Sequence, residues 1–233
     1  MRYAVIGLIG GMSWESSAEY YRIINRAVRD RLGGTHSARC LMWSFDFHDI
    51  EELQTAGDWD AAGDVLADAA LRLQAGGADF LLICTNTMHK LADRVTASVQ
   101  IPLLHIADCT AEAIQRAGLT RIGLLGTRFT MEQDFYKGRL IDGFGLDVIV
   151  PDTAGRKLVH RVIYDELVQG IISEDSRKAY ITVIDQLVAD GAEAIILGCT
   201  EITLLVQQQH SAVPLFDTTA LHAQAAVERY LGA

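Results

Sequence analysis

The sequence predicts an α/β protein with two pseudo-symmetric α/β lobes, each holding a mainly parallel sheet flanked by helices. Short apolar runs alternate with longer amphipathic stretches along all 233 residues, a pattern typical of buried parallel strands connected by helices. The chain also contains an internal repeat, in which three segments recur at nearly constant spacing. Segment 77–85 recurs at 191–199, segment 6–10 recurs at 122–126, and Pro102 has its counterpart in Pro214.

The first element is predicted to be a buried strand, because its apolar run continues until Gly10 and Gly11 interrupt it. No small-residue cleavage site follows, so we do not expect a signal peptide. Each later strand is likewise a short apolar run, and each helix is a longer stretch with the helical period. The expected strands are 3–9, 38–45, 79–84, 121–126, 147–150 and 194–198. The expected helices are 15–32, 60–75, 107–117, 132–144, 158–170, 173–189 and 218–231.

The repeat also predicts the borders of the lobes. We expect residues 1–104 together with 217–233 to form the first lobe and residues 105–216 to form the second. A solenoid is not expected, because it would need at least three shorter units. Equivalent loops of two such lobes would face one shared cleft, and interfaces of this kind are preferred ligand sites. The active site is therefore expected in the cleft between the lobes.

Composition excludes several classes of partner. The net charge is −10 and no Lys/Arg cluster is present, so we expect no binding to the phosphate backbone of nucleic acids. No run approaches the roughly 18 apolar residues that a spanning helix needs, so no membrane partner is expected. The four cysteines are far apart and form no C-x-x-C pair, which argues against disulfides and structural zinc. With no export signal, the expected location is the reducing cytoplasm.

Small residues with a hydroxyl or thiol group follow the strand in each repeat, where a helix is expected to begin. The first segment reads Thr85-Asn86-Thr87 and the second reads Cys199-Thr200. Such side chains accept hydrogen bonds from the free N–H groups of a helix start, and the same N–H groups attract a carboxylate. One segment alone would suggest a simple helix cap, whereas two at matching positions favour a ligand site. A helix start also lowers the pKa of a thiol, which favours Cys199 as a reactive group.

The remaining motifs are expected to be structural. Residues 7–11 follow a strand but do not read G-x-G-x-x-G, so no dinucleotide is expected. The histidines show no metal-binding spacing and no G-x-S-x-G elbow is present, which argues against a metal site and a serine hydrolase. Cys40, Cys84 and Cys109 are interpreted as small core residues.

Three motifs, in order along the chain, resemble the signatures of the aspartate/glutamate racemase family. They are Gly-Gly-Met-Ser-Trp-Glu-Ser from Gly10, Thr85-Asn86-Thr87, and Gly-Cys-Thr-Glu around Cys199. The first and last forms resemble the aspartate-racemase branch. Members generally carry Cys-Asn-Thr in the first repeat, so Thr85 is a departure. A threonine in that place is similar to a subgroup described as L-aspartate/glutamate-specific racemases.

The resemblance implies a racemase that needs no cofactor, acts on L-aspartate and/or L-glutamate, and is usually a homodimer. It also implies that Cys199 abstracts the α-proton of the L-enantiomer while Thr85 lies on the opposite face. Adding the repeat, the expected substrate-binding residues are Met12, Ser13, Gln54, Asn86, Thr87, Thr127 and Thr200.

The chemistry of the two groups predicts a directional bias. Racemisation without a cofactor needs one group to remove the α-proton and another to return a proton to the opposite face. A thiol with a pKa near the working pH can act as base or acid, whereas a hydroxyl is too weakly acidic to remove a proton readily. Thr85 is therefore expected to donate, so initial rates from the L-isomer should exceed those from the D-isomer. Backbone N–H groups on the substrate carboxylate would stabilise the carbanion.

Two alternatives remain open at this point. The same fold could carry another reaction, of the maleate isomerase, hydantoin racemase or arylmalonate decarboxylase type. A binding protein could also retain the two-lobed cleft without turnover, because fold alone does not fix function. Exchange of the substrate α-proton with solvent deuterium would separate a racemase from a binding protein.

Overall fold

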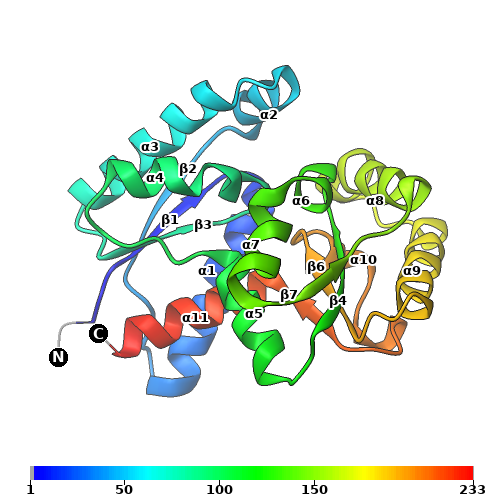
Figure 1. Cartoon of the computed structure of the whole chain (residues 1–233). Helices are drawn as coiled ribbons and strands as arrows, with labels where there is room; N and C mark the ends of the chain where they lie inside the picture. Colours follow the sequence, from blue (N-terminus) through cyan, green and yellow to red (C-terminus); the bar gives the residue numbers. More distant parts are fainter. Residues whose placement is uncertain (1–2, 233) are drawn as a thin grey trace. The chain divides into compact units, whose positions relative to one another are not determined.

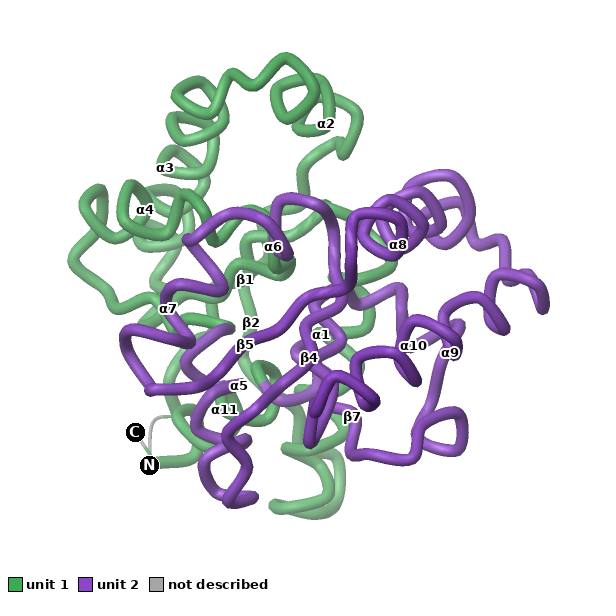
Figure 2. The backbone as a smooth tube through the Cα atoms, turned by 45° about the vertical axis from the view of Figure 1, so that its right-hand side comes forward, with its two compact units in different colours: residues 1–106, 222–233 green, residues 107–221 purple. Residues whose placement is uncertain are grey.

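The computed structural model describes residues 3–232 of the chain, and Figure 2 shows that the chain divides into two compact units. The first unit contains residues 1–106 and 222–233, and the second contains residues 107–221. Helix α5 (Ile106–Arg116) begins at the first border, and helix α11 (Thr218–Gly232) contains the second border. Met1, Arg2 and Ala233, which belong to the predicted first lobe, lie outside the described residues.

The first unit contains a three-stranded parallel sheet in the order β2-β1-β3. Helix α3 packs on β1 and β2 and against α4, and Figure 1 shows α3 and α4 side by side. The elements of this unit are β1 (Ile6–Gly10), α1 (Trp14–Leu32), β2 (Cys40–Ser44), α2 (Phe47–Ala56), α3 (Trp59–Ala75), β3 (Phe80–Ile83), the 3-10 helix η1 (Thr87–Leu91) and α4 (Ala92–Ser98).

Both faces of this sheet are buried, as its continuous apolar strands predict. Alternate residues of each strand point to opposite faces. Ile9 and Ile83 pack in one cluster with residues of α3 and η1. Leu8 and Leu82 pack in a second cluster with residues of α1 and α11. The C-terminal helix thus completes the core of the first unit.

The second unit contains a four-stranded sheet in the order β5-β4-β6-β7, and every pair of neighbouring strands is parallel. The predicted α/β class with two parallel sheets flanked by helices is therefore confirmed. The elements of this unit are β4 (Arg121–Gly126), α6 (Arg128–Glu132), α7 (Asp134–Phe144), β5 (Asp147–Ile149), α8 (Thr153–Asp165), the 3-10 helix η2 (Leu167–Gln169), α9 (Glu174–Ala189), β6 (Ala194–Gly198), α10 (Ile202–Leu205), the 3-10 helix η3 (Gln208–His210) and β7 (Leu215–Asp217).

The internal repeat extends to individual hydrogen bonds. The Asp79 carboxylate accepts from the Val5 N–H at 2.6 Å, and the Glu193 carboxylate accepts from the Arg121 N–H at 2.9 Å. Both acids therefore tie the start of their own strand to the strand beside it. The Pro102 carbonyl accepts from the Leu81 N–H and the Pro214 carbonyl accepts from the Ile195 N–H, both at 2.9 Å. The two units thus repeat one backbone plan.

The structure differs from the predicted elements in several places, and the short helices α4, α6 and α10 were not predicted. Helix α2 was not predicted, and of its ten residues it buries Ile50 and Gln54. Helix α8 begins at Thr153, five positions before the predicted start of 158, because Asp152 caps the N–H of Gly155 at 2.7 Å. Strands were also expected at the two repeated prolines; the run after Pro102 forms an isolated bridge, whereas the run after Pro214 forms β7.

Candidate functional site

The loop after β1 leaves the sheet through a turn that requires glycine. Gly11 has a φ of +87°, a backbone conformation that side chains disfavour. A Cβ at this position would lie 2.3 Å from both the backbone N and O of Phe45. The Phe45 N–H also donates to the Gly10 carbonyl at 3.1 Å. The direction of the following residues is therefore fixed by close backbone packing.

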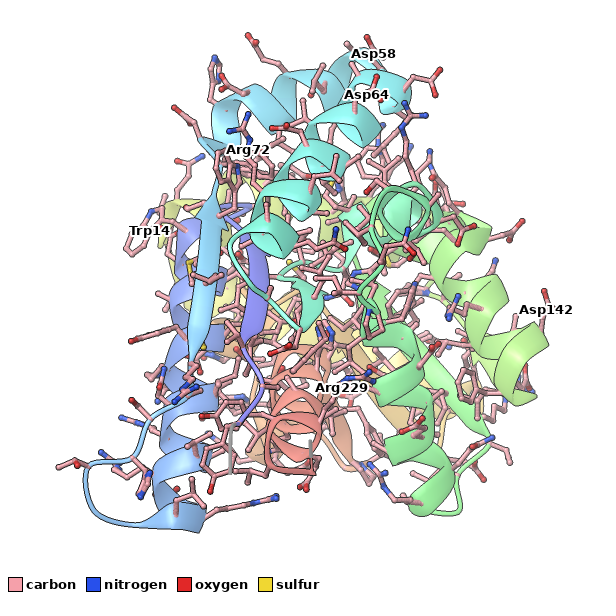
Figure 3. The ribbon with its side chains drawn as sticks, turned by 90° about the vertical axis from the view of Figure 1, so that its left-hand side faces the viewer. Trp14, Asp58, Asp64, Arg72, Asp142 and Arg229 are labelled. Atoms are coloured by element: carbon pink, nitrogen blue, oxygen red, sulfur yellow. The ribbon has the colours of Figure 1, made fainter. Side chains whose placement is uncertain are left out.

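Met12 and Ser13 follow this turn and are both buried. The Ser13 hydroxyl caps α1 by accepting from the Ser16 N–H at 3.3 Å, and the Ser13 carbonyl accepts from the Ser17 hydroxyl at 3.0 Å. Trp14 comes next and is 67% exposed, pointing outward from α1 in Figure 3. The two predicted binding residues thus lie inward of the first turn of α1.

The Thr85-Asn86-Thr87 segment leaves the same edge of the same sheet. Its strand, β3, lies beside β1 with Ile9 paired to Ile83, so the two strands end together. The Ser16 hydroxyl donates to the Cys84 carbonyl at 3.0 Å, which joins the start of α1 to this segment. The structure therefore brings Met12 and Ser13 into the same region as the Thr85 segment.

The helix that follows Thr85 differs from the expected capped α-helix. A 3-10 helix begins at Thr87, and Asn86 has a helical backbone and makes no capping bond to it. Asn86 and Thr87 are buried, whereas Thr85 is half-buried. The Thr85 carbonyl lies 2.8 Å from Nδ1 of His89. His89 belongs to the segment that the sequence singled out, but the sequence pattern assigned it no role.

Gln54 reaches this region from α2. The helix is capped at its start by Asp46 and closed at its end by Gly57 in the left-handed conformation. Gln54 is buried, and its Nε2 lies 3.0 Å from the Met88 sulfur on η1. The predicted Gln54 is therefore placed beside the helix that begins at Thr87.

The second unit has an equivalent edge where β4 and β6 end together. Gly126 pairs with Gly198, and Thr127 and Cys199 follow directly. A Cβ on Gly198 would lie 2.8 Å from the Leu125 carbonyl, so this strand end also needs glycine. Thr127 is buried and caps α6 by accepting from a backbone N–H. Two more of the predicted residues are thus neighbours.

Thr200 is tied to the start of α11. Its hydroxyl lies 2.6 Å from the Thr219 hydroxyl, and its carbonyl accepts from the Thr203 hydroxyl at 2.8 Å. The Thr219 N–H in turn donates to the Asp217 carboxylate at 2.9 Å. The hydroxyl network positions the loop that carries Cys199.

The Cys199 thiol has a carboxylate partner. Its Sγ donates to Oε2 of Glu201 at 2.9 Å, and the Glu201 side chain is buried. Burial raises the pKa of Cys199 well above its usual value, and the charge and hydrogen bond of Glu201 raise it further. The expected lowering of this pKa by a helix start is therefore wrong. The following helix, α10, has just four residues and begins only at Ile202.

Sequence reasoning named Glu201 only within the Gly-Cys-Thr-Glu motif and gave it no role. An acidic residue two positions after a candidate catalytic cysteine was the available signal. A buried carboxylate 2.9 Å from a thiol is a group that can accept the thiol proton in acid–base chemistry.

Burial holds the other three cysteines in the thiol form. Cys84 is buried in the core, and burial raises its pKa far above the usual value. Burial also raises the pKa of Cys109 to about 12 and that of Cys40 to about 11. Cys40 departs from the expected core position, since it is half-buried on the edge strand β2. Cys199 is thus distinguished by its partner, Glu201.

Within residues 3–232, no three His, Cys, Asp or Glu side chains gather in an arrangement that could hold a metal ion. Among the helices described, none combines the length and apolar character needed to cross a bilayer. What each unit presents at its strand ends is a set of hydroxyl, amide and thiol groups suited to a small polar molecule.

Comparison with known proteins identifies relatives over nearly the whole chain. The Asp/Glu/Hydantoin racemase family matches residues 9–226. A candidate Asp/Glu racemase from Yersinia pestis has a crystal structure that is 56% identical, with a TM-score of 0.93, covering 98% of this chain and 99% of that one. An aspartate racemase homologue from Pyrococcus horikoshii is 30% identical, with a TM-score of 0.84, covering 97% of this chain and 98% of that one.

The broad specificity amino-acid racemase RacX of Bacillus subtilis is 25% identical over 174 residues, which are 75% of this chain and 74% of that protein. The glutamate racemase of Aquifex pyrophilus shares the fold, with a TM-score of 0.60 and 17% identity. The match covers 96% of this chain and 83% of that one. Because the family match spans both units and includes all three motifs, the chain belongs to the Asp/Glu/Hydantoin racemase family.

Proposed function

We propose that this member of an isomerase family converts L-aspartate and/or L-glutamate to the D-isomer without a cofactor. The observation that carries the proposal is the contact between the Cys199 thiol and the buried Glu201 carboxylate. It supplies a nucleophilic sulfur together with a group that can take its proton. The RacX relative, by name an amino-acid racemase of broad specificity, supports an amino acid as substrate.

In the proposed reaction, Glu201 accepts the Cys199 proton as substrate binds. The thiolate then removes the α-proton from the L-isomer, and the electron pair of the broken C–H bond moves toward the substrate carboxylate. Thr85 donates its hydroxyl proton to the opposite face of the same carbon and regains a proton from solvent. The proton removed from the substrate remains on the pair of Cys199 and Glu201, which returns it to solvent.

The carbanion requires charge stabilisation, since no electron-sink cofactor is proposed. Preorganised N–H and hydroxyl donors on the substrate carboxylate are strongest where water is excluded. We propose that both strand ends provide these donors. The proposed binding residues are Met12, Ser13, Gln54, Asn86 and Thr87 in the first unit, and Thr127 and Thr200 in the second.

The proposal requires one substrate carbon to meet both Thr85 and Cys199. In a substrate complex, each reacting atom should approach the α-carbon to a near-attack distance of about 3–3.5 Å. We further propose that residues 1–104 and 217–233 form one lobe of the subunit and residues 105–216 form the other. The protein is proposed to be a homodimer in the cytoplasm. A crystal structure with L-aspartate and light scattering of the purified protein test these points.

Solvent exchange tests the function directly. Incubation of the protein with L-aspartate or L-glutamate in deuterated buffer should remove the α-proton signal and produce the D-isomer, measured by NMR and chiral chromatography. Cys199→Ser should abolish both, because its hydroxyl is a far weaker base than a thiolate. Wild-type protein that binds these amino acids without exchanging the α-proton would instead identify a binding protein.

A further inference from the structure

His89 is buried on η1 and bridges two backbone groups that are distant in sequence. Its Nδ1 lies 2.8 Å from the Thr85 carbonyl, and its Nε2 lies 3.2 Å from the Ile106 N–H. A carbonyl can only accept a hydrogen bond and an amide N–H can only donate one. Nδ1 therefore carries the hydrogen and Nε2 carries the lone pair, so the ring is held as one neutral tautomer.

The surroundings of His89 keep this ring in place. His105 packs against its edge with ring centroids 4.5 Å apart, and the centroid of His222 is 5.7 Å away. His222 is itself held between the Tyr20 hydroxyl at 2.8 Å and the Leu104 carbonyl at 2.9 Å. A buried ring with fixed neighbours and fixed hydrogen bonds holds its partner groups in fixed positions.

The contact with Thr85 lies at the point where the strand ends and the proposed acid begins. Residues that are half-buried at a strand end, as Thr85 is, depend on such contacts for the direction of their backbone. The His89 ring fastens the Thr85 carbonyl to the backbone at the start of α5.

We propose that His89 is a positioning residue for Thr85, which it aims at the substrate carbon by holding the Thr85 carbonyl. This inference rests on the proposed function of Thr85 as the proton donor. Its role acts through Thr85 and not on the first proton transfer, so loss of the His89 contact should impair reprotonation more than α-proton removal by Cys199.

The experiment separates the two nitrogens of the ring. The amide nitrogen of asparagine is separated from Cα by the same number of bonds as Nδ1 of histidine. His89→Asn therefore keeps a hydrogen-bond donor toward the Thr85 carbonyl. Glutamine carries its amide as far out as Nε2, so His89→Gln keeps a group near Ile106 and loses the donor. Both variants are assayed with L-aspartate and L-glutamate in deuterated buffer for D-isomer formation and for deuteration of the remaining L-isomer.

We expect His89→Gln to lower the ratio of D-isomer formation to L-isomer deuteration about tenfold or more, as misplacement of a reacting group does. His89→Asn should keep the ratio within about twofold of wild type, since its donor is retained. His210→Gln serves as a matched control, because it makes the same change at a histidine on η3 that accepts from the Gln207 backbone N–H at 3.0 Å, and it should leave the ratio unchanged. In a Thr85→Ala background, His89→Gln should have no further effect on the ratio.

A purely structural role for His89 would lower both readouts together in every variant, leave the ratio unchanged, and overturn the proposal. If wild type exchanges no α-proton at all, the proposed function fails and not the positioning role alone. If the variants do not fold, the tautomer of His89 in wild-type protein decides, read from two-bond nitrogen–proton correlations by NMR. A hydrogen on Nδ1 supports the proposal, and a hydrogen on Nε2 overturns it.

Discussion

Replacing Glu201 by glutamine removes the carboxylate that lies 2.9 Å from the Cys199 sulfur and keeps the size of the side chain. In the proposed mechanism the thiol proton passes to Glu201 with no change in the net charge of the pair. The fraction of thiolate therefore depends little on pH while the pair holds one proton. In Glu201→Gln the proton must leave to solvent instead. Loss of the Glu201 charge lowers the thiol pKa, but burial, the largest cause of the shift, still holds it above the usual value. The thiolate fraction below that pKa therefore rises tenfold for each pH unit.

The expected loss is large at neutral pH and shrinks in alkali. One general acid–base group contributes about 10²–10⁴ in rate, so kcat/KM from the L-isomer should fall by about that factor at pH 7. At roughly 1.36 kcal/mol per tenfold, this corresponds to about 3–5 kcal/mol of transition-state stabilisation. Between about pH 7 and 9 the deficit should decrease about tenfold per pH unit, while wild type stays nearly flat.

The assay is the initial rate of D-isomer formation by chiral chromatography across this pH range. Glu112→Gln is a matched control, because it makes the same chemical change at an exposed position of α5 in the same unit. It should leave both rate and pH profile unchanged. A Glu201→Gln enzyme with a flat profile and activity within about threefold of wild type would refute Glu201 as the acceptor of the Cys199 proton.

Three further predictions follow from the same structure. Thr85→Cys should raise the initial rate from D-aspartate or D-glutamate about tenfold or more, because a second thiol can act as base. If this variant does not convert the D-isomers while Cys84→Ala loses activity, Thr85 is not the second acid–base residue. Gly11→Ala should lower the melting temperature, since a left-handed backbone at alanine costs about 1–3 kcal/mol and the new Cβ would lie 2.3 Å from the Phe45 backbone. The control Gly143→Ala, with open space around the new Cβ, should leave the melting temperature unchanged. Racemisation should survive dialysis against a chelator, and the protein should show no pyridoxal absorbance.

The fold was predictable because the signals for it are local and repeated. A short apolar run is buried in any parallel sheet, and the two aligned runs ended up as β3 and β6. The glycines that begin the aligned segments, Gly77 and Gly191, both have positive φ, at 95° and 97°. Because the same pattern occurs twice, each copy supports the strand predicted from the other. The sequence therefore specified the sheets without help from a relative.

The elements that were not predicted have weak or misleading local signals. Helix α2 has ten residues and buries two of them, so few apolar positions mark it in the sequence. The predicted helix began at 158, whereas α8 begins at Thr153 and contains Gly155, where a Cβ would lie 2.8 Å from the Pro151 side chain. In both cases tertiary packing decides what the local sequence leaves undetermined.

The details of the site were less predictable for a different reason. The pKa of Cys199 depends on burial and on a carboxylate that the chain folds against it, and neither is a property of the motif. The His89 side chain links the Thr85 carbonyl to the Ile106 N–H, two backbone groups that are distant in sequence. Motif spacing can locate a catalytic position, but the groups that set its proton affinity and orientation come from three-dimensional contact.

The repeat gives the two strand ends the same backbone plan and different chemistry. The Cys199 end holds a carboxylate against the thiol, so a proton can be taken up there. The Thr85 end holds a neutral imidazole against a backbone carbonyl, and this contact orients the hydroxyl without providing it a base. If both ends act on one substrate carbon, as we propose, the enzyme has one face that removes protons and one that supplies them. At saturating substrate, initial rates then favour L to D, whereas kcat/KM is equal in the two directions, because the two isomers have the same free energy and a catalyst leaves their equilibrium unchanged.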